Sequence, residues 1–278
     1  MTKIANISVG GRNPVRIMGI LNTSPESFYK KSINTTRTKI KNAVIQMEND
    51  GADFIDVGGM STAPYLSTIV SEKIESKRVL DAIKIIQNHT NLPISVDTCR
   101  SSVAEKALKN DVEIINDISG LKYDKKTISV LKRYKTPFVI HHIQGTPTTM
   151  QVHPKYKNVL FDIYDFFEER IKHVRINGIK HNNIIVDPGI GFGKNLKHNM
   201  KLISNISIFH SLGFPILLGI SRKKFIKDIS GINDSKNRFG GTISASLYAT
   251  LQGVQILRIH DVNEVIQSIK VFKKLIKN

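Results

Sequence analysis

The strongest constraint on the fold is an alternation, repeated along the chain, of short apolar runs and longer amphipathic stretches. The runs are rich in β-branched residues and apolar on both faces, which is typical of parallel strands buried beneath helices. The eight strand candidates are residues 15–21, 54–57, 94–96, 114–116, 138–141, 184–186, 216–220 and 256–259. The predicted helices are residues 37–49, 71–88, 101–110, 124–134, 156–177, 196–211, 240–252 and 262–276. Eight strand–helix units in a row indicate an α/β fold that closes into a (β/α)8 TIM barrel, rather than an open doubly wound sheet.

The length of the chain agrees with this prediction, because such a barrel needs about 250 residues and the chain has 278. No linker or low-complexity tract divides it, so we expect a single domain over residues 1–278. Residues 4–9, followed by Gly10-Gly11-Arg-Asn and Val15, predict a short N-terminal β-hairpin that closes the barrel floor. The local signals for turns are Gly10-Gly11 and Gly240-Gly241, and those for helix N-caps are Ser71 and Asp261.

The charge balance is strongly basic, with 41 Lys and Arg residues against 23 Asp and Glu residues and a formal net charge of +18. Such a balance occurs in proteins that bind nucleic acid, anionic membranes or acidic substrates. Here the lysines are scattered through the predicted helices, no arginine-rich tract occurs, and aromatic residues make up 7% of the chain. We therefore expect solvated helix faces and no nucleic-acid partner, although a positive surface would still attract a pyrophosphate.

The cysteine content and the apolar runs bear on location. The single cysteine, Cys99, cannot form an internal disulfide, which favours a reducing compartment. The N-terminus lacks the apolar segment of a signal peptide, and no apolar run approaches the ~20 residues that a membrane span requires. We expect a soluble, cytoplasmic protein with no membrane partner.

Polar residues stand at the end of every predicted strand, where a hydrophobic core would not need them. In a (β/α)8 barrel, chemistry takes place at the carboxyl ends of the strands. One such residue is equally well explained by a helix cap or a satisfied hydrogen bond, but eight groups at one rim indicate a site. The groups are Asn22; Asp56 with Gly58-Gly59; Asp97; Asn116-Asp117; His141-His142; Asp187; Ser221-Arg222-Lys223; and Arg258 with His260-Asp261.

The residue types at this rim suit a flat heterocycle with amide, amidine and amine edges and an attached anion. A carboxylate such as Asp97 or Asp187 accepts two parallel N–H bonds from a guanidine-like edge, and Lys223 can donate to a ring carbonyl. Arg258 offers a planar cation that can stack on a ring or bind phosphate. The other rim residues with matching chemistry are Asn116, Asn22 and His260.

Several other chemistries are disfavoured. No nucleophile elbow or Ser-His-Asp order is present, and no motif around Cys99 supplies a base. The histidines lack Cys or His partners at the spacing of zinc sites. The glycine-rich stretch from Asp187 to Lys194 follows a strand and precedes a helix, but its spacing matches neither the dinucleotide nor the P-loop fingerprint. It indicates phosphate binding only weakly.

Taken in order, the rim motifs resemble those of one family, the dihydropteroate synthases, within the wider group of pterin-binding barrels. The resemblance extends over about residues 15 to 262 and is specific because every motif falls at a strand end. The first four matching segments are Met18-Gly-Ile-Leu-Asn22 with Pro25-Glu-Ser-Phe28; Asp56-Val-Gly-Gly with Ser61-Thr62; Ser95-Val-Asp97-Thr98; and Ile115-Asn116-Asp-Ile-Ser-Gly120. The other four are His142-Ile-Gln-Gly-Thr-Pro147 with Thr149-Met-Gln151; Asp187-Pro-Gly-Ile-Gly-Phe192-Gly-Lys; Gly219-Ile-Ser-Arg-Lys223; and Arg258-Ile-His260-Asp-Val.

The resemblance implies a transferase that condenses 6-hydroxymethyl-7,8-dihydropterin pyrophosphate with an arylamine and releases pyrophosphate, with no enzyme nucleophile. The implied pterin-binding residues are Asp97, Asn116, His141, Asp187, Phe192, Lys223 and Arg258. Those for pyrophosphate are Asn22, Arg258 and His260, with Mg2+ near Asn22. Those for the arylamine are Thr62, Pro64, Phe192, Lys223 and Lys224, and the implied catalytic residues are Asp97, Lys223 and Arg258. The family also implies a homodimer, with residues 240–252 and 262–276 at its interface.

The chain departs from the family pattern mainly on the arylamine side. The family usually carries Ser-Thr-Arg-Pro where this chain has Ser61-Thr62-Ala63-Pro64. The other departures are Met60 in place of Glu, Phe28-Tyr29-Lys30-Lys31-Ser32 in place of Phe-Ser-Asp-Gly-Gly, Lys224 in place of Ser, and His141 where Met is frequent. This pattern resembles the divergent archaeal-type branch of the family.

The departures lead to a hypothesis about the arylamine. Ala63 would open space, and Lys30, Lys31 or Lys224 would supply charge for a larger phosphorylated amine, such as the ribofuranosyl-aminobenzene phosphate of methanopterin synthesis, in place of p-aminobenzoate. Equally, these lysines follow from the basic composition alone.

Two rival functions fit a pterin-binding barrel. A methyl-pterin:corrinoid methyltransferase shares the fold but has no use for the pyrophosphate clamp that we infer from Arg258-Ile-His260 and Ser221-Arg-Lys223. A non-catalytic pterin-binding homologue is compatible with Ala63, since the loss of one cation weakens stabilisation of the leaving group.

Overall fold

The computed structural model describes residues 2–25, 34–61 and 70–276. Its strands are β1 (Thr2–Ile4), β2 (Ile7–Val9), β3 (Arg16–Asn22), β4 (Phe54–Gly58), β5 (Ile94–Asp97), β6 (Ile114–Asp117), β7 (Phe138–His141), β8 (Ile184–Asp187), β9 (Leu217–Gly219) and β10 (Ile256–Ile259). Its α-helices are α1 (Arg37–Asn49), α2 (Glu72–Gln87), α3 (Ser101–Leu108), α4 (Thr127–Tyr134), α5 (Val159–Ile176), α6 (Leu196–Ser204), α7 (Lys224–Ser230), α8 (Phe239–Leu251) and α9 (Val262–Leu275). Shorter 3-10 helices are η2 (His181–Asn183), η3 (Ile206–Leu212) and η4 (Ser235–Asn237).

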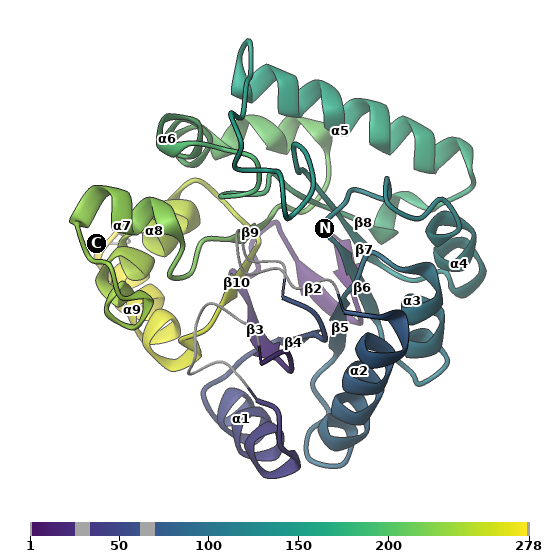
Figure 1. Cartoon of the computed structure of the whole chain (residues 1–278). Helices are drawn as coiled ribbons and strands as arrows, with labels where there is room; N and C mark the ends of the chain where they lie inside the picture. Colours follow the sequence, from purple (N-terminus) through teal and green to yellow (C-terminus); the bar gives the residue numbers. More distant parts are fainter. Residues whose placement is uncertain (1, 26–33, 62–69, 277–278) are drawn as a thin grey trace.

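Strands β3 to β10 form one parallel sheet in the order β8-β7-β6-β5-β4-β3-β10-β9. A parallel bridge between Val186 and Ile216 joins the two outer strands and closes the sheet. Figure 1 shows the helices arranged around this barrel. The predicted (β/α)8 fold is therefore confirmed, with all eight predicted strands present in the sheet.

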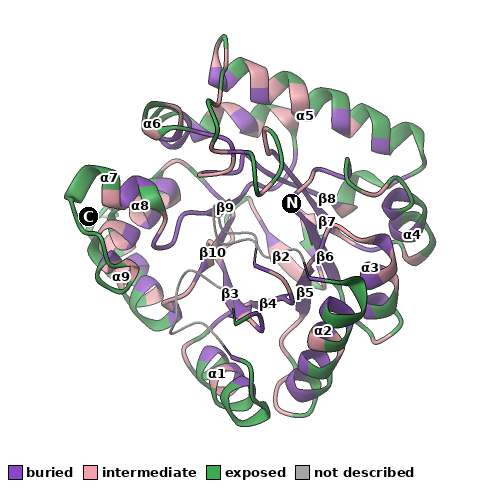
Figure 2. Cartoon of the chain, viewed as in Figure 1, coloured by how far each residue is buried: buried purple, intermediate pink, exposed green. Residues whose placement is uncertain are grey.

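The strands and helices pack as the apolar patterns predict. Figure 2 shows the barrel strands largely buried, while the helices expose the faces that point away from the barrel. In α1, for example, the buried residues Ile40, Val44 and Met47 follow helical spacing and pack in the core between the sheet and the helices. The predicted cap of α2 is present, because the Ser71 hydroxyl accepts a hydrogen bond from the backbone N–H of Ile74 at 3.4 Å.

The helices differ from the prediction in three places. The expected helix at 196–211 is divided at Asn205 into α6 and η3. Helix α7 was not predicted, and it ends where Gly231 adopts a φ of 73°. The predicted turn at Gly240-Gly241 is wrong, because both glycines lie in α8. A Cβ on Gly241 would lie 2.3 Å from Ile226 Cγ2, so the glycine lets α8 approach α7 closely.

The predicted N-terminal hairpin is present, but its turn lies earlier than the glycine pair. Strand β1 pairs with β2 in antiparallel register, with Ile4 opposite Ile7. The two turn residues, Ala5 and Asn6, have φ values of 47° and 65°, as the tight turns that suit the twist of a hairpin require. Gly10 and Gly11 also have positive φ, but they lie between β2 and β3.

The hairpin closes one end of the barrel with an apolar layer. Ile4 and Val9 pack against one inward-facing residue from each of seven strands. These residues are Met18, Phe54, Ile114, Val139, Ile185, Leu217 and Ile256. The expectation that the hairpin covers the barrel floor is confirmed, and the opposite, carboxyl end remains for a site.

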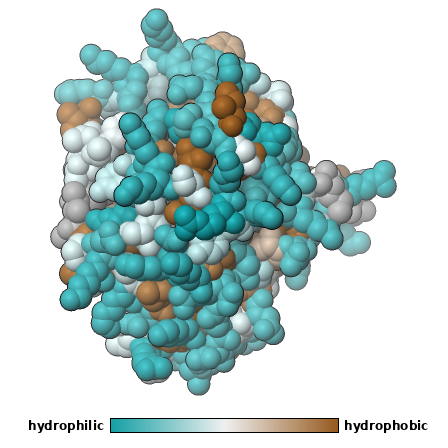
Figure 3. Space-filling view, turned by 90° about the vertical axis from the view of Figure 1, so that its right-hand side faces the viewer, coloured by the Kyte–Doolittle hydropathy of each residue, from teal (hydrophilic) through white to brown (hydrophobic). Residues whose placement is uncertain are grey.

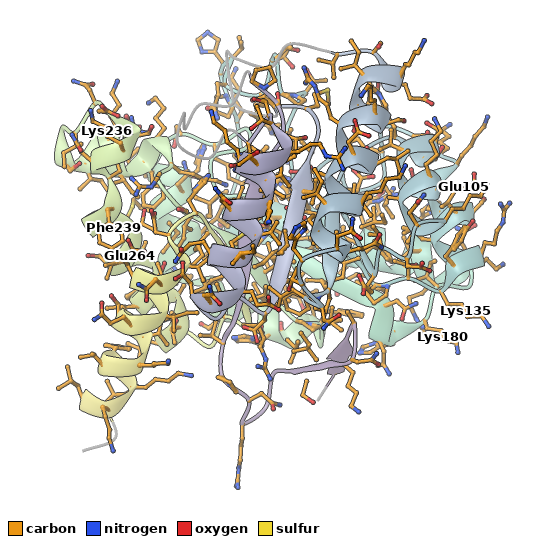
Figure 4. The ribbon with its side chains drawn as sticks, turned by 90° about the horizontal axis from the view of Figure 1, so that it is seen from below. Glu105, Lys135, Lys180, Lys236, Phe239 and Glu264 are labelled. Atoms are coloured by element: carbon orange, nitrogen blue, oxygen red, sulfur yellow. The ribbon has the colours of Figure 1, made fainter. Side chains whose placement is uncertain are left out.

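The surface of the molecule is mostly polar on the face in view. The face in Figure 3 is largely hydrophilic, with apolar residues dispersed over it. In Figure 4, Lys135, Lys180 and Glu105 lie at the periphery of the molecule. Among the described residues, no helix has both the length and the apolar character that crossing a membrane requires.

Candidate active site

A polar layer lies directly above the apolar floor of the barrel. Side chains that point to the same face of a strand are two residues apart, so the residue two positions after each floor residue also points inward. These second positions are the apolar Ile20, then Gly219, and five polar residues, Asp56, Asn116, His141, Asp187 and Arg258. Strand register adds Asp97, which is paired with Asn116 on one side and with Gly58 on the other. The structure thus brings together most of the site residues that the sequence predicts.

Arg258 occupies the centre of this layer between two carboxylates. Its Nε donates to Asp56 Oδ2 at 2.5 Å, and its Nη2 donates to Asp97 Oδ2 at 3.1 Å. Burial alone would lower the pKa of Arg258, but the charges of Asp56 and Asp97 outweigh it and raise this pKa. The guanidinium is therefore permanently charged, and its Nη1 has no partner among the described residues.

The pKa of Asp97 is set mainly by burial. Its side chain is only 9% exposed, and burial raises its pKa to about 7, although the positive charge of Arg258 opposes this rise. The negative charges of Asp56 and Glu75 add to it. Its charge at neutral pH consequently depends on what binds beside it.

Two buried oxygens in the layer have no hydrogen-bond partner among the described residues, and they are Asp56 Oδ1 and Asn116 Oδ1. Asn116 is oriented by its Nδ2, which donates to Asp56 Oδ2 at 3.2 Å. A buried polar atom left without a partner costs about 1–3 kcal/mol. A ligand with N–H groups at matching positions would recover this free energy, so the pocket favours a molecule rich in donors.

Asp187 and Lys223 form the opposite side of the site. Burial raises the pKa of Asp187 to about 6, while Lys223 and the N–H of Gly189 oppose the rise. Burial lowers the pKa of Lys223 to about 8, and Asp187 opposes that change. Near pH 7 the pair is mainly a carboxylate and an ammonium. A Cβ on Gly219 would lie 3.6 Å from Lys223 Nζ, an ordinary van der Waals distance, so Gly219 borders the ammonium.

Aromatic rings line the wall next to Lys223. Its ammonium lies 4.8 Å from the centre of the Phe192 ring and donates to the carbonyl of Ile190 at 2.5 Å. The His141 ring meets Phe192 edge-on at 4.5 Å, and its Nδ1 donates to the Ile118 carbonyl at 3.0 Å. Burial lowers the pKa of His141 well below its usual range, so the ring is neutral.

The glycine-rich stretch from Asp187 to Lys194 is a packing loop. A Cβ on Gly189 would lie 2.0 Å from the His142 carbonyl oxygen, and one on Gly193 would lie 2.5 Å from that of Gln144. The Lys194 ammonium is buried against this segment, 2.9 Å from His142 Nδ1 and 2.8 Å from the Phe192 carbonyl oxygen. Sequence reasoning missed Lys194 and the role of Asp56, although the two-residue spacing from the floor residue Phe54 marks Asp56 as inward-facing.

Asn22 and His260 lie at the ends of β3 and β10. A Cβ on Gly58 would lie 3.7 Å from Asn22 Oδ1 and 3.9 Å from Asp97 Cβ, so Asn22 and Asp97 flank a position with no side chain. His260 Nδ1 lies 2.9 Å from the Ser221 hydroxyl. Burial, with the charge of Arg258, lowers the pKa of His260 to about 3, which makes it a neutral group.

Some expected residues are not brought into this arrangement. Thr62 and Pro64 lie outside the described residues, as do the replaced positions Ala63, Lys30 and Lys31. Lys224 begins α7, is exposed, and forms an ion pair with Asp228 at 2.8 Å along the same helix. Asp261 occupies the N-cap position of α9, as predicted, but its carboxylate makes no cap hydrogen bond and instead accepts from Arg222.

The pterin binding enzyme family matches this chain over residues 18–260. The chain belongs to this family. Its relatives include the dihydropteroate synthase of Synechocystis sp., which is 38% identical over 256 residues, covering 92% of this chain and 88% of the relative. Dihydropteroate synthases are transferases, and the resemblance inferred from the motifs is confirmed.

Solved structures agree on the fold. The Yersinia pestis dihydropteroate synthase with a sulfonamide drug complex has a TM-score of 0.92 and 30% identity, covering 99% of this chain and 98% of its own. The Xanthomonas albilineans dihydropteroate synthase with 4-aminobenzoic acid has a TM-score of 0.87 and 31% identity, covering 95% and 93%. These relatives are bacterial and give no support to an archaeal-type assignment.

Proposed function

We propose that this chain joins 6-hydroxymethyl-7,8-dihydropterin pyrophosphate to p-aminobenzoate and releases pyrophosphate, a step of folate biosynthesis. The observation that carries the proposal is the polar layer. It combines two unpartnered buried oxygens with a carboxylate–ammonium pair and a fixed arginine. A flat heterocycle with several N–H donors, one carbonyl and an attached anion complements these groups.

The pterin would be bound by its edges and faces. Asp187 accepts from the guanidine-like edge, the Asn116 carbonyl oxygen accepts a further ring N–H, and Lys223 donates to the ring carbonyl. Support for these roles comes from the unpartnered Asn116 Oδ1 and from the opposite charges of Asp187 and Lys223 at neutral pH. His141 and Phe192 would supply the apolar wall, and Arg258 would lie against the ring.

The pyrophosphate would meet Asn22, Arg258 and His260. Arg258 has Nη1 available for an oxygen of the leaving group, and the neutral His260 would contribute a hydrogen bond. A magnesium ion also fits here, because the Asn22 amide oxygen is a hard ligand and Mg2+ commonly binds through one or two protein oxygens, water and substrate phosphates. Among the described residues, no group of three His, Cys, Asp or Glu side chains could hold a metal alone. Bound Mg2+ would neutralise charge on the leaving group.

The proposed chemistry needs positioned charges and no covalent partner from the enzyme. The C–O bond between the pterin methylene and the pyrophosphate breaks, and its electron pair leaves with the pyrophosphate. The methylene then carries positive charge, which Asp97 stabilises electrostatically. Because an adjacent cation favours the ionised carboxylate, the pKa of about 7 at Asp97 makes it responsive to this charge. The amine nitrogen forms the new C–N bond and loses a proton to solvent.

The identity of the arylamine depends on the residues around Lys223. Phe192 and Lys223 are proposed to contact both substrates, which the 4.8 Å contact between the ammonium and the ring supports, and Thr62 and Pro64 are proposed to complete the pocket. The Xanthomonas albilineans relative, solved with 4-aminobenzoic acid, supports p-aminobenzoate. Lys224 is paired with Asp228, so it does not favour a phosphorylated amine over p-aminobenzoate.

Release of pyrophosphate tests the proposal. Purified protein would receive dihydropterin pyrophosphate and Mg2+ with p-aminobenzoate, with the ribofuranosyl-aminobenzene phosphate, or with no amine. We expect pyrophosphate and dihydropteroate with p-aminobenzoate. A higher kcat/KM for the phosphorylated amine would transfer the assignment to the methanopterin route.

The same assay distinguishes the rivals. A methyltransferase would bind a methylated pterin and a corrinoid but release no pyrophosphate. A non-catalytic homologue would bind the pterin and give no product with any amine, and that result would refute the enzymatic proposal. Titration with a corrinoid is the matching control.

We further propose a homodimer formed through α6, α7 and α8. A groove of about 380 Å³ between these helices is lined mainly by apolar residues, among them Phe225, Ile226 and Ile229. Ile229 is 60% exposed and Tyr248 is 39% exposed, and because both line the same groove they belong to one apolar surface that a second copy of the chain would cover. The expected interface at α8 and α9 therefore shifts toward α6 and α7. Light scattering should show a dimer, and Ile229→Asp should give monomers; a monomeric wild type would exclude the dimer.

A cytoplasmic location remains part of the proposal. Cys99 is a free cysteine among the described residues, which supports a reducing compartment. Fractionation of the source cells would test it.

A further inference from the structure

The turn after β9 holds a residue in a strained backbone conformation. Arg222 has a φ of 57°, in the left-handed region, where a residue with a Cβ costs about 1–2 kcal/mol. It stands between Ser221, which contacts His260, and Lys223, which contacts Ile190. Because strain of this kind persists only where surrounding contacts impose it, the contacts of Arg222 indicate what the turn is built to hold.

The side chain of Arg222 is 6% exposed and is bound from two directions. Its Nε donates to Asp261 Oδ2 at 2.8 Å, and its Nη2 donates to Asp261 Oδ1 at 2.6 Å, a two-pronged ion pair. Its Nη1 donates to the carbonyls of Ser235 and Lys236 at 2.9 and 2.5 Å. Lys236 lies at the outer edge of the molecule in Figure 4, and none of these hydrogen-bond partners of the guanidinium belongs to the polar layer.

The backbone of Arg222 is held as well. Its N–H donates to the Thr242 hydroxyl at 2.9 Å, and its carbonyl accepts from Arg238 Nη1 at 3.0 Å. Arg238 also donates to the carbonyls of Ile232 and Asn233. The β9 turn, the segment before α8 and the first turn of α8 are thus joined through one buried residue.

We propose that Arg222 and Asp261 are positioning residues for the pyrophosphate end of the site. Asp261 directly follows His260, and Arg222 directly follows Ser221, so their ion pair connects the two strand ends whose side chains meet 2.9 Å apart. The inference rests on the proposed function, which assigns pyrophosphate to His260 and Arg258. It replaces the expectation that Arg222 itself belongs to the pyrophosphate clamp.

The pair should affect one end of the site more than the other. The pterin end depends on Asp187 and Asn116, which belong to β8 and β6 and do not contact Arg222 or Asp261 in any hydrogen bond given by the structure. His260 and Ser221, in contrast, would shift if the pair were broken. A displacement of ~1 Å in a positioned group can cost on the order of 100-fold.

Asp261→Asn tests the inference, because it removes the charge and keeps the size of the side chain. The dissociation constants of inorganic pyrophosphate and of 6-hydroxymethylpterin, which lacks pyrophosphate, would be measured for wild type and variant. We expect the constant for pyrophosphate to rise about tenfold or more and that for the pterin to change by less than about twofold. If Asp261→Asn does not fold, the double variant Arg222→Gln with Asp261→Asn leaves no unpaired buried charge and serves instead.

The matched control is Asp53→Asn. Asp53 accepts from Arg16 Nη1 at 2.9 Å and from the N–H of Ile17 at the barrel floor, far from the carboxyl ends of the strands. The Asp53→Asn variant should melt at a lower temperature than the wild type, while its dissociation constants for pyrophosphate and for the pterin stay unchanged. The positioning role would be overturned if Asp261→Asn weakened the binding of pyrophosphate and of the pterin equally. It would also be overturned if Asp261→Asn changed the pyrophosphate constant no more than Asp53→Asn does. Both measurements are of binding and require no turnover. A wild type that binds pyrophosphate but never forms product would therefore refute the proposed function and leave the positioning role standing.

Discussion

Replacing Asp187 with asparagine removes one negative charge from the polar layer and nearly preserves the shape of the side chain. In the wild type, the N–H of Gly189 donates to Asp187 Oδ1 at 2.7 Å, which orients the carboxylate. In the variant, an amide N–H2 group could face the donor edge of the pterin, where two donors would repel each other. The substitution therefore tests the pterin orientation proposed above.

The expected loss follows from the hydrogen bonds involved. Hydrogen bonds to charged groups contribute about 1.5–3 kcal/mol, and about 1.4 kcal/mol corresponds to a tenfold change in affinity. We expect pterin to bind Asp187→Asn between about 10-fold and 100-fold more weakly than the wild type. Lys223 should add to this loss of affinity. Burial lowers its pKa to about 8, and the negative charge of Asp187 keeps that pKa from falling further. Without Asp187 that pKa falls further, and the ammonium loses its proton at lower pH.

The pH dependence provides a second measurement. In the wild type, protonation of Asp187 below its pKa of about 6 and deprotonation of Lys223 above its pKa of about 8 should both weaken pterin binding. Binding should therefore be strongest between these values. The variant should lose the part of the acidic limb that Asp187 contributes, and its alkaline limb should move to lower pH.

The stability of the ligand-free protein should change in the opposite direction. Burial raises the pKa of Asp187 from 3.8 to about 6, so the folded state binds this proton more tightly than the unfolded state. The ionised carboxylate then destabilises the fold above pH ~6, and this cost disappears as the pH falls below ~4. Its ceiling is about 3 kcal/mol, at 1.36 kcal/mol for each pKa unit. Asp187→Asn should therefore melt at or above the wild-type temperature near pH 7.5.

Calorimetric titration with 6-hydroxymethylpterin from pH 5.5 to 9, together with thermal unfolding, would measure both effects. Asp228→Asn is the matched control, since Asp228 pairs with the exposed Lys224 on α7, outside the polar layer, and should leave pterin binding unchanged. Retention of wild-type affinity by Asp187→Asn, with unchanged pH limbs, would show that the pterin does not meet this carboxylate.

Three further predictions concern the loop, the hairpin and the whole chain. Gly193→Ala should weaken pterin binding more than tenfold by titration, because its Cβ would lie 2.5 Å from the Gln144 carbonyl oxygen and its φ is 66°; unchanged affinity would show that the loop can shift. Asn6→Val should cost about 1–2 kcal/mol of unfolding free energy in a urea melt, because its φ is 65°, while kcat stays at the wild-type value. Residues 1–278 are proposed to be one domain, so calorimetry should give a single unfolding transition, and two separable transitions would contradict this.

Much of the barrel could be predicted because its strands repeat one simple requirement. Each strand is covered by helices, so it must be apolar on both faces, and the chain shows eight such runs. Polar residues such as Asn116 and Asp187 interrupt this pattern at the strand ends, which is why they could be recognised as site residues. The hairpin turn was misplaced because glycine pairs are a stronger turn signal than Ala5-Asn6, yet the register of Ile4 with Ile7 required the turn there.

Other features depend on contacts that no local pattern contains. Arg258 is bound to Asp56 across 202 positions of sequence, and only the closure of the barrel brings β10 beside β3, so that Arg258 reaches Asp56 on the next strand, β4. Lys194 ends a glycine-rich stretch of the kind that binds phosphate. In the structure, however, the glycines of this stretch pack against His142 and Gln144, and the Lys194 side chain lies in the interior. Arg222 belongs to a motif of site residues, but its guanidinium is bound by Asp261 and by the carbonyls of Ser235 and Lys236.

The amino-acid sequence by itself determined the barrel, the end of it that carries the site, and most of the residue types at that end. These follow from apolar periodicity, which depends on near neighbours in the chain. The tertiary structure decided which carboxylate meets Arg258, which buried oxygens lack partners, and which members of each motif face inward. Those properties depend on distances between residues far apart in sequence and on the removal of water around them. Burial is also what shifts the pKa values of Asp97, Asp187 and Lys223 toward neutrality, and no sequence pattern expresses burial of that degree.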